Sequence, residues 1–189
     1  MNVLSLFDGC SGGQLALQRA NIHVENYFAS EIDKYAIKVT QANFPNTIQL
    51  GDVQVFSLKG FTFQEDIDLL MGGSPCQGFS FAGNQLNFDD ERSKLFFDFI
   101  RIRDECMPKY VLLENVRMSK KSQDVISKYM GFEPQALNSS KVSAQNRYRL
   151  YWFGRKILDP LCSGKYEQIP IPPMIDKGIT MQDILEDGY

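Results

Sequence analysis

Short apolar runs alternate with segments of helical spacing along most of this sequence, and that alternation constrains the fold more than any other feature. Four runs have the length and character of buried strands: NVLSLF (2–7), ENYFASEI (25–32), IDLLMGG (67–73) and KYVLLEN (109–115). Three intervening segments have helical character: 12–20, 33–44 and 93–107. Strands and helices that alternate in this order form a mostly parallel sheet with helices on both faces. The sequence therefore predicts an α/β fold.

Weaker signals extend this pattern toward the C-terminus. A short strand is expected at 48–53, a helix at 122–132 that ends at Gly131, and a late strand at 146–154. Within 33–44, the side chains of Tyr35, Ile37, Val39 and Ala42 are candidates for an apolar stripe. Beyond Gly154 the chain is rich in turn-forming residues, with a last short helix expected at 180–189.

Composition narrows the class of protein. A chain of 189 residues with 43% hydrophobic and 23% charged residues is expected to form one soluble globular domain. No apolar run is long enough to cross a membrane, and the N-terminus has no basic leader. A net charge of −3 argues against holding nucleic acid by bulk electrostatics, so any such role needs local sites or a partner.

The four cysteines are Cys10, Cys76, Cys106 and Cys162. They lie far apart and form no CxxC pair, so we expect neither a metal site nor a disulfide framework. Free thiols of this kind favour a cytoplasmic location.

Unusual polar residues follow the predicted strands, where ligands bind in open parallel sheets. The loop FDGCSGG (7–13) opens the first helix, whose N-terminus favours anions, although the loop is neither a GxGxxG motif nor a P-loop. Glu31 follows Gly13 by 18 residues, about the spacing at which an acid can bind a ribose hydroxyl. Read singly, the loop is a tight turn and Glu31 a solvated or capping acid; read together, they favour a nucleoside-containing cofactor.

Cys76 has three readings: a buried small side chain, a redox or metal-binding thiol, or a nucleophile. The surrounding glycines of GGSPCQG and its place after a strand favour an accessible thiol. The only histidine, His23, lies between two early elements, which gives a Cys–His pair little support. Glu114 directly follows three apolar residues, so it requires either a salt-bridge partner or a ligand.

Four stretches in this order, LFDGCSGG, GGSPCQGFS, LLENV and QNRYRLYW, resemble the DNA (cytosine-5) methyltransferase family over residues 2–154. The wording KVSAQNRYRLYW is closer to the de novo branch and similar phage enzymes than to typical restriction-linked members. The resemblance implies a Rossmann-like S-adenosylmethionine-dependent methyltransferase fold. It also implies methyl transfer from S-adenosylmethionine, leaving S-adenosylhomocysteine, to carbon 5 of a cytosine flipped out of DNA.

The resemblance assigns roles to individual residues. Cys76 matches the nucleophile, Glu114 the acid at the cytosine edge, and Arg147 and Arg149 the basic pair of the active site. Phe7 matches the aromatic residue on the cofactor adenine, Glu31 the acid on its ribose, and Asp52 and Val53 the pair at the adenine edge. The other implied cofactor contacts are Asp8, Gly9, Cys10, Ser11, Gly12, Gly13, Ile32, Gly73, Pro75 and Leu95.

The family pattern continues beyond Gly154 with a target recognition domain and a final conserved element, for which the remaining residues are too few. We therefore expect a catalytic domain at 1–154 and an extension at 155–189 that leads toward an absent recognition domain. A second polypeptide is one candidate for that missing part, in a bacterial or phage-infected cell. Two other functions stay open: an RNA (transfer RNA) cytosine methyltransferase, and a non-catalytic cofactor-binding subunit.

Overall fold

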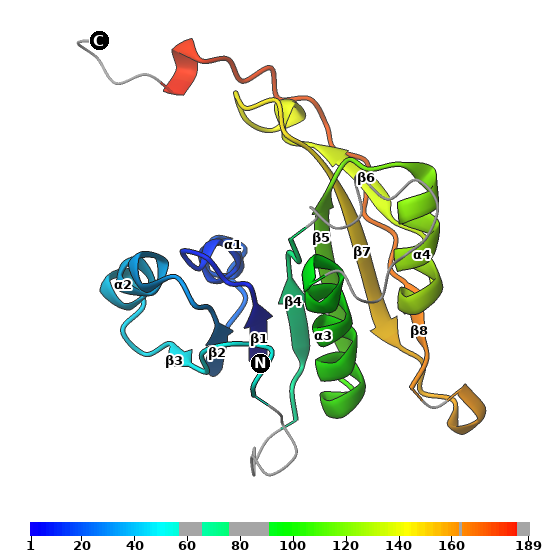
Figure 1. Cartoon of the computed structure of the whole chain (residues 1–189). Helices are drawn as coiled ribbons and strands as arrows, with labels where there is room; N and C mark the ends of the chain where they lie inside the picture. The colour runs from blue at the N-terminus through cyan, green and yellow to red at the C-terminus, as the bar shows by residue number, and fades with distance from the viewer. Residues whose placement is uncertain (57–65, 76–90, 163, 185–189) are drawn as a thin grey trace.

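The computed structural model describes residues 1–56, 66–75, 91–162 and 164–184. These residues contain an eight-stranded sheet with the order β3-β2-β1-β4-β5-β7-β6, in which β8 also pairs with β7 (Figure 1). The strands are β1 (Asn2–Leu6), β2 (Asn26–Ser30), β3 (Ile48–Gln49), β4 (Leu69–Gly72), β5 (Tyr110–Val116), β6 (Gln135–Asn138), β7 (Tyr148–Lys156) and β8 (Tyr166–Gln168).

The helices follow the strands along the chain as the sequence pattern predicts. They are α1 (Gly12–Arg19), α2 (Lys34–Asn43), α3 (Glu91–Cys106) and α4 (Lys120–Met130), with 3-10 turns η1 (Ser139–Lys141), η2 (Pro160–Cys162) and η3 (Gln182–Ile184). Helix α4 begins where the Ser119 side chain accepts a hydrogen bond from the Ser122 N–H. It ends at Gly131, whose φ of 89° and N–H bond to the Ser127 carbonyl confirm the predicted stop.

Strand direction explains where a ligand site can form. β1 pairs in parallel with β2 and β4, and β4 with β5, whereas β7 pairs antiparallel with β5, β6 and β8. The prediction of a mostly parallel α/β sheet is confirmed. The carboxyl ends of β1, β2, β4 and β5 therefore meet at one edge of the sheet, the place where open α/β folds bind ligands.

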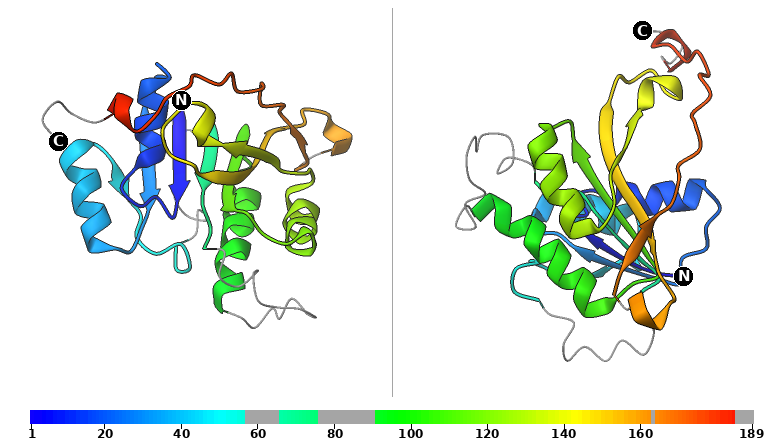
Figure 2. Two further views of the ribbon diagram at one scale, coloured as in Figure 1. Left: turned by 90° about the horizontal axis from the view of Figure 1, so that it is seen from above. Right: turned by 90° about the vertical axis from the view of Figure 1, so that its right-hand side faces the viewer.

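Alternation along the strands divides the core between two faces. Leu4 of β1 packs in one apolar cluster with Phe96 and Phe99 of α3. Its neighbour Val3 belongs to a second cluster with Leu17 of α1, because successive strand residues point to opposite faces. Figure 2 shows α3 and α4 on one side of the sheet and α1 on the other, so the predicted helices on both faces are confirmed.

Several predictions near the edges of the sheet need correction. The expected strand at 48–53 is only two residues long, β3. β7 continues to Lys156, and the predicted loop beyond Gly154 contains β8, which pairs with β7. β6 was also missed, because QALN carries no strand alternation in its sequence. Of the last helix expected at 180–189, the described residues contain the short 3-10 turn η3, and residues 185–189 lie outside the described part of the chain.

The apolar stripe predicted on α2 is wrong. Tyr35 is 66% exposed and Val39 44% exposed, and Thr40 is the buried residue of this helix. Tyr35, Val39 and Ala42 do share one face, at i, i+4 and i+7, but this face is exposed, and Ile37 lies on the other side of the helix. In Figure 1, α2 lies beside the β3–β2 end of the sheet, away from its central strands.

Candidate active site

The loop after β1 has an unusual backbone. Phe7, Gly9 and Ser11 have φ angles of 57°, 59° and 57°, in the left-handed region. Non-glycine residues in that region cost of order 1 kcal/mol or more and persist only where the surroundings hold them. The Asp8 N–H donates to the Ser30 carbonyl (3.2 Å), which ties this loop to the end of β2. Two of the four non-glycine residues with positive φ in the described part of the chain therefore lie in the loop that the sequence singles out for cofactor binding.

Glu31 joins the loops after β1 and β2. Its Oε2 accepts a hydrogen bond from the Gly9 N–H (2.7 Å), and its Oε1 accepts from the N–H groups of Ile32 (2.7 Å) and Asp33 (2.9 Å). A carboxylate that bonds to three backbone N–H groups is fixed in direction. Glu31 is therefore held at the mouth of the sheet edge, where its remaining acceptor capacity can meet ligand hydroxyls.

A cavity of about 270 Å³ opens beside Glu31. Its lining is mainly apolar and comes from the loops after β1, β2, β3 and β4 and from α3. The lining residues are Phe7, Ser30, Glu31, Ile32, Asp52, Val53, Gln54, Pro75 and Leu95. Seven of these are predicted cofactor residues, brought together from separate parts of the chain. An aromatic ring and aliphatic side chains facing a fixed carboxylate fit a nucleoside, with an apolar base and a hydroxylated sugar.

Ser30 and Gln54 also line this cavity, and the sequence reasoning missed both. Each is next to a predicted residue, Ser30 before Glu31 and Gln54 after Val53, so chain neighbourhood was the only available signal. The predicted residues Asp8, Gly9, Cys10, Ser11, Gly12 and Gly13 do not line the cavity; they form the adjacent loop and the start of α1.

The segment Gly73–Pro75 after β4 connects this cavity to a second group of polar residues. Asn115 is buried at the end of β5, and its Nδ2 donates to the Ser74 carbonyl (3.2 Å). A Cβ added to Gly73 would lie 3.1 Å from Glu114 Oε2, so glycine allows the segment to run close to this carboxylate. Pro75 lines the cavity, and Cys76, which follows it, lies outside the described residues.

Glu114 faces the two predicted arginines. Arg149 Nε lies 2.8 Å from Glu114 Oε1 and an Arg147 guanidinium nitrogen lies 3.9 Å from the same oxygen. The Arg149 Nε contact does not have hydrogen-bond alignment, so this pair is an ion pair without a locked geometry. The side chain of Glu114 is 31% exposed, which leaves the carboxylate open to a ligand. Arg147 directly precedes β7, and Arg149 is its second residue.

Tyr151 adds a group that the sequence reasoning missed. It is directly opposite Glu114 in the β5–β7 register. Burial, together with the negative charge of Glu114, raises the pKa of Tyr151, so its hydroxyl stays protonated near neutral pH. Successive strand residues point to opposite faces, so the spacing of 147, 149 and 151 was the signal that could have placed Tyr151 beside the two arginines.

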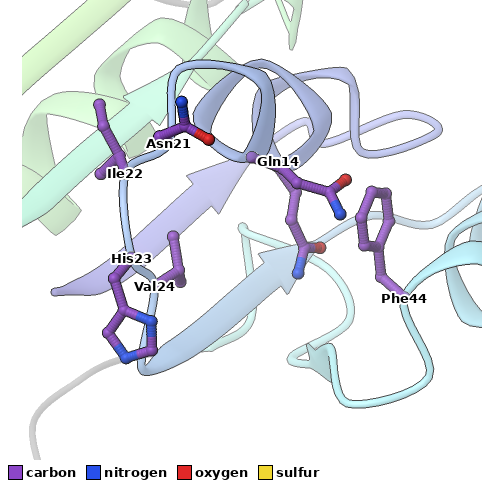
Figure 3. Close-up of a pocket in the computed structure, with 7 residues that line it drawn as sticks. Gln14, Asn21, Ile22, His23, Val24 and Phe44 are labelled. Carbon is purple, nitrogen blue, oxygen red and sulfur yellow. The ribbon is translucent and has the colours of Figure 1, made fainter.

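His23 lies far from this edge of the sheet. The N-terminal amine of Met1 donates to the His23 carbonyl (3.0 Å), which places His23 at the amino end of β1. A cavity of about 420 Å³ lies there, with Phe44 and Gln14 at one end and His23 at the other (Figure 3). Pro75 follows β4 at the opposite, carboxyl edge, and Cys76, the other member of the Cys–His pair considered above, lies outside the described residues. Among the described residues, no three His, Cys, Asp or Glu side chains form a group able to hold a metal ion.

Comparison with known proteins identifies the family. The sequence model of the C-5 cytosine-specific DNA methylase family matches residues 1–188. The chain belongs to this family. The type II methyltransferase M1.ScrFI of Lactococcus lactis subsp. cremoris is 34% identical over 99% of this chain. The type II methyltransferase M.Eco47II of Escherichia coli is 35% identical over 98% of it.

The chain spans about half the length of these methylase relatives, 50% of the first and 46% of the second. A solved structure described as a DNA modification methyltransferase encoded within an Escherichia coli prophage is also similar, with a TM-score of 0.72 and 28% identity. That match covers 97% of this chain and 53% of the solved one, and it supports the Rossmann-like fold. None of the helices in the described part of the chain is long and apolar enough to span a membrane.

Proposed function

We propose that the complete protein, meaning this chain with the polypeptide that completes it, transfers a methyl group from S-adenosylmethionine to carbon 5 of a cytosine in DNA. One observation carries the proposal. A nucleoside-sized cavity and the Glu114–arginine group are joined by the three residues that lead directly to Cys76. A cofactor and a pyrimidine bound in these two places would meet beside the segment Gly73–Pro75, which Cys76 follows in the sequence. Membership of the C-5 cytosine-specific DNA methylase family supports the same reaction.

The cavity suits the adenosine half of the cofactor. Phe7, Val53 and Leu95 offer apolar surface for the adenine, and Glu31 offers carboxylate oxygens to the ribose hydroxyls. The loop Asp8–Gly13 lies beside the cavity at the start of α1, where backbone N–H groups and the helix dipole favour the cofactor's carboxylate. When bound, S-adenosylmethionine supplies an electrophilic methyl group on a sulfonium.

The remaining residues activate the cytosine. Carbon 5 is a weak nucleophile, so the Cys76 thiolate adds to carbon 6 and the ring electrons move toward carbon 5. Glu114 holds the N3 edge of the ring, where electron density increases during this addition, and Arg149 supports the O2 side. After carbon 5 has accepted the methyl group, a base removes its proton and the carbon–sulfur bond breaks. Cys76 is then released as a thiolate and the cytosine regains its aromatic ring.

DNA binding requires surface beyond this site. A stacked cytosine cannot reach Cys76, so it must be flipped out of the duplex, and a net charge of −3 gives this chain little general attraction for phosphate. We propose that the base-reading surface comes from polypeptide outside these 189 residues, either in continuation of the chain or as a separate subunit. The proposed setting is the cytoplasm of a bacterial or phage-infected cell.

Transfer of a labelled methyl group tests the proposed reaction. The complete protein is incubated with labelled S-adenosylmethionine and either double-stranded DNA or transfer RNA, and the label is located by nucleoside analysis. We expect 5-methylcytosine in DNA, and none with Cys76→Ala or Glu114→Gln. If the label is found in RNA alone, the substrate class is RNA and the proposal of DNA as the substrate is wrong. The absence of transfer to either polymer by a protein that binds the cofactor would favour a non-catalytic subunit.

Binding of this chain alone to DNA tests the second part of the proposal. Equilibrium titration with a cytosine-containing duplex should show weak binding without sequence preference. Tight, sequence-specific binding by the 189 residues would refute the need for an additional base-reading surface.

A further inference from the structure

Tyr27 is a buried tyrosine whose hydroxyl reaches the loop after β1. It pairs with Val3 in the β1–β2 register and belongs to the apolar cluster that includes Met71 beneath α1. Only 3% of Tyr27 is exposed. Its hydroxyl donates a hydrogen bond of 2.7 Å to Asp8 Oδ1. A side chain of the core is therefore bonded directly to a loop residue at the cofactor end of the sheet.

The Asp8 carboxylate has a second partner. Its Oδ2 accepts a hydrogen bond from the Ser11 hydroxyl, and Ser11 is fully buried. Asp8 lies between Phe7 and Gly9 of the strained loop, and Ser11, the residue before α1, shares the left-handed conformation. One carboxylate thus connects the fixed hydroxyl of Tyr27 to the far side of the loop. Bonds of this kind, with a charged acceptor, can offset the cost of the strained backbone.

The hydroxyl also lies against the first turn of α1. A Cβ added to Gly13 would lie 3.3 Å from the Tyr27 hydroxyl and 2.5 Å from Met71 Sδ. Glycine at this position lets the start of α1 approach both side chains. Tyr27 therefore contacts the loop system at Asp8 and limits the position of the helix that follows it.

We propose that Tyr27 is a positioning residue for cofactor binding: through Asp8 it holds the Phe7–Gly13 loop in the conformation that S-adenosylmethionine or S-adenosylhomocysteine binds. The inference rests on the proposed function, because it concerns the same cofactor site. Tyr27 acts on the cofactor through Asp8 and Ser11, since it does not line the cavity itself. The hydroxyl, and not the aromatic ring, is the part that carries this role.

The surroundings of Tyr27 keep its hydroxyl protonated, so that it can donate a hydrogen bond. Burial first, and then the negative charge of Asp8, raise the pKa of Tyr27 far above its usual range, while hydrogen bonds from Ser5 and the Gln14 backbone act in the opposite direction. The Tyr27 hydroxyl therefore keeps its proton near neutral pH and can donate it in the hydrogen bond to Asp8.

Two tyrosine-to-phenylalanine variants test the proposal. Tyr27→Phe removes the hydroxyl at the loop, and Tyr166→Phe is the matched control. Tyr166 is also buried, at 6% exposure, and its hydroxyl donates to the Pro108 carbonyl (3.0 Å) away from the cavity. S-adenosylhomocysteine binding is measured by calorimetry on the 189-residue chain, and stability by thermal melting. We expect both variants to melt at lower temperature, but only Tyr27→Phe to raise the Kd, by about 10-fold.

A double-mutant cycle separates positioning from general destabilisation. Asp8→Ala removes the acceptor of the Tyr27 hydrogen bond, and it should also raise the Kd for S-adenosylhomocysteine. The variant carrying both changes should bind no more weakly than the weaker single variant, because both changes break the same bond. Should Tyr27→Phe be largely unfolded at the assay temperature, the Kd of both tyrosine variants is measured at a lower temperature at which both are folded, with weaker binding expected only for Tyr27→Phe.

The outcomes distinguish this inference from the proposed function. Failure of the wild-type chain to bind S-adenosylhomocysteine would overturn the proposed cofactor site, and the role of Tyr27 with it. Normal wild-type binding with an unchanged Kd for Tyr27→Phe, equal weakening by both tyrosine variants, or additive effects of Tyr27→Phe and Asp8→Ala would overturn the role of Tyr27 alone.

Discussion

Replacement of Gly73 by alanine tests whether the close approach between the Gly73–Pro75 segment and Glu114 is needed for catalysis. The new Cβ would lie 3.1 Å from Glu114 Oε2 and 3.7 Å from the Glu114 carbonyl oxygen. Ordinary van der Waals contact begins at 3.4 Å, so the carboxylate must move by about 0.3 Å. The carboxylate is the free end of a side chain, so the fold itself should tolerate the change.

The expected effect is on the chemical step. Misplacement of a catalytic group by about 1 Å costs about 100-fold in rate, so a shift of about 0.3 Å predicts a kcat lower by about 3- to 10-fold. That loss corresponds to about 0.7 to 1.4 kcal/mol in the activation free energy. The measurement is single-turnover methyl transfer to DNA by the complete protein. The Kd for S-adenosylhomocysteine and the melting temperature are measured on the same preparation, and both should change little.

Two results would refute this reasoning. An unchanged kcat would show that the distance between Gly73 and Glu114 has no catalytic weight. A raised Kd for S-adenosylhomocysteine with normal kcat would place Gly73 at the cofactor, the role that the family resemblance implies for it.

Three further changes test separate parts of the structure. Glu31→Ala should raise the Kd for S-adenosylhomocysteine by at least about 10-fold, because it removes a charged acceptor; calorimetry showing unchanged affinity would contradict the site. Asp68 accepts a hydrogen bond from Lys109 (2.5 Å), and chiefly because of this bond its pKa lies below the usual 3.8. The contribution of Asp68 to stability is lost as the pH falls through that lowered pKa. Asp68→Asn should therefore lower the melting temperature at pH 7 and make little difference in strong acid; a pH-independent difference would count against the ion pair. Burial raises the pKa of the Cys106 thiol to about 12, so iodoacetamide at pH 8 should label the exposed Cys10 and spare Cys106, as mass spectrometry of the native chain would show.

The central fold was predictable because it depends on local, repeated signals. β1, β4 and β5 are short apolar runs, and the helix-forming segments between them have their own start and stop residues, such as Gly131 after α4. These signals survive in any sequence that builds a buried parallel sheet. These local signals do not set the order of the strands in the sheet, which only the structure shows.

The edges of the fold were not predictable in the same way. β8 is three residues long and is held by pairing with β7, a contact between segments that no local pattern records. The apolar residues of α2 illustrate the converse, because Tyr35 and Val39 have the composition of a buried face but remain exposed. Pairing with β7 determines where β8 forms, and the position of α2 at the end of the sheet leaves Tyr35 and Val39 exposed (Figure 1).

The residues of the site likewise fall into those that local motifs predict and those that only tertiary contacts reveal. Phe7, Glu31, Val53 and Leu95 could be named from motifs, and the cavity that brings them together follows from the parallel strands. The bond between Tyr27 and Asp8 could not be anticipated, because it joins a strand interior to a loop 19 residues away. Similarly, the need for glycine at position 73 became clear only from the position of Glu114 across the sheet.

A covalent complex between Cys76 and a cytosine is the most direct test of the proposed reaction. DNA that carries 5-fluorocytosine should trap it, because fluorine cannot leave carbon 5 as a proton does after methyl transfer. With S-adenosylmethionine present, the complete protein should form a complex that survives denaturation, and peptide mapping should locate the link at Cys76. The Cys76→Ala variant should form none. Methyl transfer to DNA without such a complex, or a link to another residue, would contradict the account.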